Sequence, residues 1–186
     1  MDMPNSLAGR ILLALPSIGD LRFHRSAIAI CSHDDAGAMG IGIDALVSGV
    51  TAGDLFDSIG VTGTHHRDRP VHYGGPVEMQ RGFILHDSGW IDEPMLDVAC
   101  NWALSASRDV LGAIADDRGP ARWMLALGYA GWGQGQLEAE LAANAWHVAD
   151  FDDGLFYDDP AAGKWAAHFA AQGIDASRIA ASGGSA

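Results

Sequence analysis

The sequence predicts an α+β fold in which a mixed, strongly curved, barrel-like β-sheet is flanked by a few short helices. Short apolar runs bounded by Gly, Pro, Asp or Ser outnumber the helical patterns and do not alternate strictly with them. The 24 glycines fit a chain with many turns between strands. With 186 residues, 48% of them apolar, we expect a single domain over residues 1–181 and a flexible tail at 182–186.

Eight segments are expected to be strands because each is a short apolar run between turn residues. In chain order they are 10–14, 27–32, 40–43, 71–73, 82–86, 102–104, 123–128 and 146–149. The glycine-rich run 128–135 is expected to be a tight turn that places Tyr129 and Trp132 against the core. A phosphate-binding loop is the alternative for this run, and the acids that follow it would compete with an anionic ligand.

Four helices are expected. Thr51 followed three residues later by Asp54 has the pattern of a capping box, and Ser107 is placed to cap a second helix. The third helix spans 136–143, with Glu138 and Glu140 directed outward. The fourth spans 164–172 and ends before a glycine.

The charge balance disfavours two classes of partner. A formal net charge of −13 repels nucleic-acid phosphates and anionic membranes. The sequence contains neither a signal-peptide pattern nor an apolar run near the ~20 residues of a membrane span. We therefore expect a cytoplasmic protein whose two cysteines are reduced. The histidines lack a metal-ligand spacing such as HExxH, so we expect no metal and no cofactor.

Four segments carry further information: PSIGDLRFHRSAIAICSHDDAGAMGIGI (16–43), GGPVEMQRGFILH (74–86), SASRDVLGAIA (105–115) and LGYAGWGQGQLEAELAANAWHV (127–148). In content and order they resemble the YqgE/AlgH family of bacterial proteins. The resemblance implies an α+β fold with a barrel-like mixed sheet and an unsettled activity, in a family often labelled transcriptional regulators. Members commonly carry an Asn-Arg pair after the GAMG strand, where this chain has Asp44 and Ala45.

Six residues of these segments are candidate ligand-binding residues: Arg22, His24, Arg25, Arg81, Arg108 and Trp132. Arg22 and Arg25 either form a fork for a carboxylate or phosphate, or make internal salt bridges with nearby acids. If the four arginines of the set converge, they would bind one acidic ligand.

Cys31 and His33 lie two residues apart on an expected strand, so their side chains should share a face. A nearby imidazolium would lower the pKa of the thiol and give a redox-responsive or catalytic cysteine. The alternative is a buried, inert cysteine in an apolar strand.

These observations favour a non-enzymatic binding or regulatory protein that acts through a protein partner or a small anionic ligand. Any effect on transcription would then be indirect, and a homodimer is permitted. One alternative is a redox-responsive or catalytic protein that uses Cys31. The other is a direct nucleic-acid binder, for which aromatic side chains could stack on bases.

Overall fold

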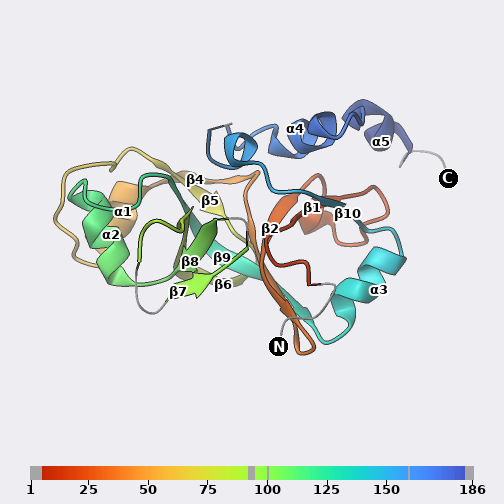
Figure 1. Ribbon diagram of the computed structural model, residues 1–186. Helices are drawn as coiled ribbons and strands as arrows, with labels where there is room; N and C mark the ends of the chain where they lie inside the picture. The colour runs from red at the N-terminus through yellow and green to blue at the C-terminus, as the bar shows by residue number, and fades with distance from the viewer. Residues whose placement is uncertain (1–5, 92–94, 100, 159, 183–186) are drawn as a thin grey trace.

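The computed structural model describes residues 6–91, 95–99, 101–158 and 160–182 (Figure 1). A strongly curved sheet of ten strands carries several short helices, which confirms the predicted α+β class. Eight strands follow the order β10-β1-β2-β3-β9-β6-β8-β7, and β4 and β5 join this path where β5 pairs with β9. The β5–β9 pair is parallel and the other pairs are antiparallel, so the sheet is mixed.

The strands are β1 (Ile11–Ala14), β2 (Ala27–Asp34), β3 (Gly37–Gly42), β4 (Leu46–Thr51), β5 (Pro70–Tyr73), β6 (Val77–Asp87), β7 (Met95–Asp97), β8 (Trp102–Ser105), β9 (Trp123–Gly133) and β10 (Trp146–Ala149). The helices are α1 (Ala52–Ser58), α2 (Arg108–Ala115), α3 (Gln136–Ala142), α4 (Lys164–Ala171) and α5 (Ala176–Ser182). A 3-10 turn, η1 (Leu21–Phe23), and a π-helical turn, η2 (Gly154–Asp158), complete the described elements.

All eight predicted strands and all four predicted helices are present. Thr51 and Asp54 form the expected capping box, and the Ser107 hydroxyl accepts the amide hydrogen of Val110. Strands β4 and β7 and helix α5 were not predicted. The expected tail starts inside α5, which ends at Ser182, and residues 183–186 lie outside the described residues.

Both faces of the sheet are buried, as the alternation along β1 illustrates. Ile11 and Leu13 pack in one apolar cluster with α4 and η2, whereas Leu12 and Ala14 pack in a second cluster with α3. A third cluster lies between α1, α2 and the strands beside them. In Figure 1, α1 and α2 lie at one end of the molecule and α3 at the other. No helix in the part of the chain described here has the length and apolar character that a bilayer crossing requires.

The glycine-rich run after residue 128 is mostly strand, which corrects the expected tight turn. Strand β9 continues to Gly133, and only the residues directly after it turn toward α3. The first part of β9 pairs with β6 and β5, and its last four residues pair with β3. Tyr129 and Trp132 both pack against apolar clusters as expected, but on opposite faces of the sheet.

Strand β9 changes partner from β5 to β3 at a close contact between main chains. The Gly74 amide donates to the Leu127 carbonyl at 2.8 Å, and its carbonyl accepts the Gly42 amide at 2.7 Å. A Cβ atom on Gly74 would overlap the Gly128 carbonyl oxygen, and one on Gly75 would overlap the main chain of Tyr129. Glycine is therefore required at this position because the backbone of β9 fills the space of a side chain.

We expect Gly74→Ala to destabilise the protein by about 1–3 kcal/mol, because the added methyl group must displace main chain rather than a side chain. Gly112→Ala is the matched control, since Gly112 lies within α2 and a Cβ there meets nothing within 4 Å. That control should stabilise the protein by about 0.5–1 kcal/mol through helix propensity. Urea unfolding measures both changes. Equal effects of the two substitutions would contradict the close contact.

Candidate functional site

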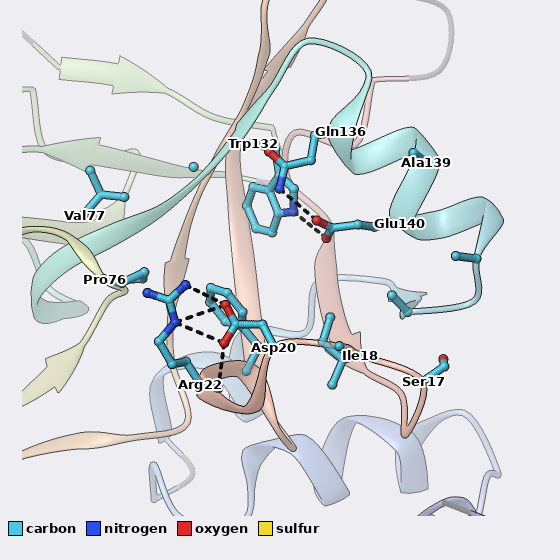
Figure 2. A pocket seen from close by; sticks show the side chains of 15 residues that line it. Ser17, Ile18, Asp20, Arg22, Pro76, Val77, Trp132, Gln136, Ala139 and Glu140 are labelled. Carbon is cyan, nitrogen blue, oxygen red and sulfur yellow. Dashed lines mark hydrogen bonds and ion pairs between the residues drawn. The ribbon is translucent and has the colours of Figure 1, made fainter.

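A pocket of about 650 Å³ lies between η1, α3, the end of β9 and the turn before β6 (Figure 2). Three of the four segments that carry the family resemblance line it, although they are far apart in the chain. Its apolar lining includes Ile18, Phe23, Val77 and Trp132. Its charged lining residues are Asp20, Arg22 and Glu140.

Glu140 holds one side of the pocket together. Its Oε2 atom accepts the indole N–H groups of Trp132 at 2.9 Å and of Trp146 at 2.7 Å. Its Oε1 atom accepts the Gln136 amide at 2.9 Å, and the oxygen of that amide accepts the Gly133 main-chain N–H. Both tryptophans are buried, so this carboxylate satisfies donors that would otherwise be lost to water.

The outward placement expected for Glu140 is therefore wrong. It lies one helical turn after Gln136, on the face of α3 that meets β9. The spacing of Trp132, Gln136 and Glu140 was the sequence signal for this network. It was missed because acids at a helix start are usually solvated.

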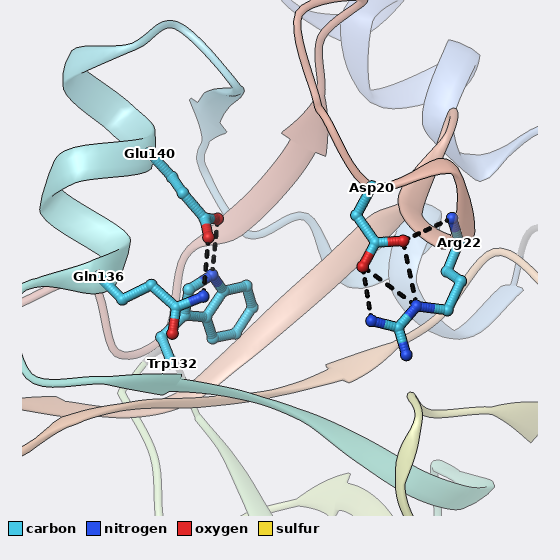
Figure 3. A network of polar contacts seen from close by, with 5 residues as sticks. All are labelled: Asp20, Arg22, Trp132, Gln136 and Glu140. Carbon is cyan, nitrogen blue, oxygen red and sulfur yellow. Dashed lines mark hydrogen bonds and ion pairs between the residues drawn. The ribbon is translucent and has the colours of Figure 1, made fainter.

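Asp20 and Arg22 face this network from the other side of the pocket (Figure 3). Arg22 donates through Nη2 and Nε to the Asp20 carboxylate, with Nη2 at 2.6 Å from Oδ2. Asp20 also caps η1 by accepting the Arg22 main-chain N–H. Hydrogen bonds from the Arg22 side chain lower the pKa of the Asp20 carboxyl. Arg22 thus forms an internal ion pair, the second of its two predicted roles.

Arg25 and Arg81 lie away from this pocket. The Arg25 guanidinium lies 5.8 Å from the ring centroid of Trp165. Arg81 donates to Glu78 at 3.1 Å and lies 5.2 Å from the ring centroid of Phe83. The Arg22–Arg25 fork is therefore not formed.

Arg108 is also elsewhere, since it donates to the Gly60 carbonyl at 2.9 Å beside α1. His24 is exposed at the end of η1. The four arginines of the resemblance segments do not converge. Of the six candidate ligand-binding residues, the structure brings only Arg22 and Trp132 into one pocket.

Cys31 and His33 do not share a face, because β2 contains a β-bulge. Ile30 pairs with Gly40, and Ser32 pairs with Met39, the neighbour of Gly40 in β3. Cys31 therefore has no partner in β3 and is the extra residue of the bulge. After the bulge His33 faces α3, where its Nε2–H donates to Glu138 at 2.7 Å. Its Nδ1 accepts the Leu7 amide at 3.0 Å.

The thiol of Cys31 lies in the apolar cluster on the opposite face. Burial raises its pKa well above the ordinary value, which disfavours the thiolate. This environment matches the alternative of a buried, inert cysteine. The second cysteine, Cys100, lies outside the described residues. Among the described residues, no group of three or more His, Cys, Asp or Glu side chains is arranged to hold a metal ion.

The environment of Asp44 shows how the departure from the Asn-Arg pair affects the local structure. Its Oδ1 accepts the Ala27 amide at 2.9 Å, at the start of β2. Burial raises the pKa of this carboxyl to about 6. An asparagine at this position could accept the same hydrogen bond without placing a negative charge in a poorly solvated site.

Comparison with known proteins gives one consistent result. Residues 11–177 match the model of the AlgH-like family. A UPF0301 protein from Sphingopyxis alaskensis is 49% identical over 183 residues, which cover 98% of each chain. A UPF0301 protein from Caulobacter vibrioides is 42% identical over 181 residues, which cover 96% of this chain and 93% of that one.

Two solved structures have the same fold. The solution structure of the AlgH protein from Pseudomonas aeruginosa superposes with a TM-score of 0.81 at 34% identity, covering 100% of this chain and 99% of that one. The crystal structure of a Corynebacterium diphtheriae protein has a TM-score of 0.68 at 21% identity, covering 90% of this chain and 87% of that one.

We expect Glu140→Ala to destabilise the protein by about 2–4 kcal/mol, because it leaves two buried indole N–H groups without an acceptor. The control Gln136→Ala removes an exposed partner of the same carboxylate and should cost less than about 1 kcal/mol. Urea unfolding followed by tryptophan fluorescence measures both. If the two variants are equally mild, Glu140 does not hold this side of the pocket together.

We expect Asp44→Asn to change stability in a pH-dependent way. Because the folded state raises the pKa of this carboxyl from 3.8 to about 6, folding takes up a proton between these values. The wild type therefore loses stability as pH rises from about 4 to about 6, and the variant lacks that loss. Relative to wild type, the variant should gain about 2–3 kcal/mol between pH 4 and pH 7.5. A stability difference that is constant across this range would refute the assignment.

Proposed function

This chain belongs to the AlgH-like family, and we propose that it is a regulatory binding protein that holds a segment of a partner protein in the pocket between η1, α3 and β9. Any effect on transcription is then indirect and passes through that partner. The observation that carries the proposal is the arrangement of pre-paired polar groups around an apolar lining drawn from three distant segments.

The pre-paired groups favour binding because little has to be reorganised when a ligand enters. Asp20 and Arg22 hold each other on one side, and Glu140 is held by three N–H donors on the other. A pocket whose polar side chains are already fixed loses less conformational entropy on binding. The apolar lining between the two sides then offers a place for an anchoring side chain of the partner.

The rim of the pocket supports a protein rather than a small solute as the partner. Leu21, in η1, is 84% exposed, and Val77, which lines the pocket, is 37% exposed. Exposed apolar side chains beside a pocket are typical of protein interaction sites. We propose a partner segment with an aromatic or aliphatic anchor.

The charge of the pocket favours a basic or neutral segment over an anion. Two carboxylates and one guanidinium line it, so its formal charge is negative. A basic group next to the anchor would be attracted by this excess of negative charge. In this pocket, the excess of negative charge also disfavours the small anionic ligand that the arginines suggested.

Direct nucleic-acid binding has less support. Seven of the ten arginines form ion pairs with aspartate or glutamate in the described residues: Arg10, Arg22, Arg67, Arg81, Arg118, Arg122 and Arg178. Phosphate contacts need positive groups that gather on one face and are not already neutralised.

We expect Ala139→Phe to abolish partner binding, because Ala139 is exposed on α3 and lines the pocket. The matched control is Ala142→Phe, on an exposed residue of the same helix that does not line it. Peptides selected from a random displayed library should bind wild type and Ala142→Phe alike. They should bind Ala139→Phe at least about tenfold more weakly, which corresponds to about 1.4 kcal/mol.

Two results would contradict the proposal. One is a set of selected peptides that bind all three proteins equally. The other is binding of fluorescent duplex DNA with a steep salt dependence, which would show that the arginines form a phosphate-contacting surface.

A further inference from the structure

A second cavity, of about 310 Å³, lies where β5 and the start of β9 meet η2, residues 160–161 and the start of α4. It shares no described residue with the first pocket. Most of its walls are apolar, with Leu46, Pro70, Trp123, Met124 and Leu125 among them. It also collects three nitrogen-bearing side chains, those of Arg69, His72 and Lys164, in a chain that is acidic overall.

Arg69 brings a positive charge that the described residues leave uncompensated. Its guanidinium lies 5.1 Å from the ring centroid of Trp123 and forms no ion pair or hydrogen bond within the described part of the chain. Seven of the other nine arginines are ion-paired there, so Arg69 belongs to a minority without a described carboxylate partner.

Lys164 places a second positive charge beside the cavity. Its side chain is almost fully buried, and its ammonium donates to the Leu155 carbonyl at 2.6 Å and to the carbonyl of Phe156. Asp158 is the single acid among the described lining residues, and its carboxylate is bound to the Arg122 guanidinium.

His72 contributes an acceptor. It is 8% exposed, and its Nδ1 lies 3.3 Å from the Leu125 carbonyl, to which it donates. Nε2 is then the lone-pair atom, and no described residue donates to it. Burial, together with smaller effects of the charges of Lys164 and Arg69, lowers the pKa of His72 to about 4. The imidazole is therefore neutral at pH 7 and can accept a hydrogen bond.

We propose that this cavity binds a small phosphate monoester, with Arg69 facing its oxyanion, His72 Nε2 accepting from its P–OH group, and Trp123 contacting its apolar body. A phosphate monoester fits better than a carboxylate or sulfate. Its second pKa is about 6, so at pH 6.5 about a quarter of it carries an acidic proton together with a negative charge. A carboxylate or a sulfate ester has no proton to offer to His72 at that pH.

The proposal does not depend on peptide binding in the first pocket. It makes the protein one that senses a phosphorylated small molecule at a separate site. Tyr157 also lines the cavity, with its ring under the Arg122 guanidinium at 5.1 Å, so it forms wall rather than a phosphate contact.

The test is a titration with phenyl phosphate at pH 6.5, followed by the NMR signals of the His72 imidazole and the Trp123 indole. We expect both signals to shift and to saturate, and phenyl sulfate to bind at least about tenfold more weakly. Arg69→Met should weaken phenyl phosphate at least about tenfold while leaving the melting temperature unchanged, since Arg69 is exposed and holds no structural ion pair. Arg118→Met, at an exposed arginine paired with Asp116, is the matched control and should bind as wild type does.

Three outcomes would overturn the proposal. Absence of saturable shifts at millimolar phenyl phosphate would remove the site. Equal affinity for phenyl sulfate would remove the proton-sharing role of His72 and with it the assignment to phosphate monoesters. Equal affinity of wild type and Arg69→Met would show that the oxyanion is not held by this cavity.

Discussion

Both halves of the sheet depend on the contact of the Gly74–Gly75 main chain with that of β9. Before this contact β9 runs parallel to β5, and after it β9 pairs with β3. Gly74 joins the two arrangements, because it donates to Leu127 in β9 and accepts from Gly42 in β3. No side chain fits between the strands here, so glycine permits a change of partner without an unpaired, buried amide.

The change of partner also determines where the first pocket forms. Beyond Gly128, successive residues of β9 point to opposite faces of the sheet, with Tyr129 on one and Trp132 on the other. Trp132 is thereby directed at α3, where Glu140 accepts its indole N–H. Pro76, in the turn that follows Gly75, and Val77, at the start of β6, form the opposite wall. One close contact between main chains thus positions two walls of the pocket.

The sequence predicted those parts of the fold that local physical chemistry determines. The buried strands show as apolar runs, and the helix caps show as Thr51 and Ser107. It did not predict β4, because that strand lies at the edge of the sheet, is interrupted by Ser48 and Gly49, and is only partly buried. It also missed the last part of β9, because glycines in a strand that packs closely against other main chain cannot be told from turn glycines.

The candidate site was less predictable, because bulges and ion pairs depend on contacts between distant segments. A spacing of two placed Cys31 and His33 on one face, but the bulge in β2 rotates His33 to the other. Arg22 looked available to a ligand, although the acid that neutralises it lies two residues earlier. Sequence patterns locate such groups but cannot show which partner each one takes.

The pairing of charges explains why the two cavities differ in chemistry. In an acidic chain most arginines form ion pairs with nearby carboxylates. A pocket lined by such ion pairs, like that of Arg22 and Asp20, has polar walls but does not attract anions. An arginine can remain unpaired where an aromatic face holds it instead, as Trp123 holds Arg69. The buried Lys164 side chain, which donates to the Leu155 and Phe156 carbonyls, lies next to the same cavity. Beside His72, an arginine that no described carboxylate pairs with thus lies against an aromatic ring, whereas the arginine of the first pocket is neutralised by Asp20.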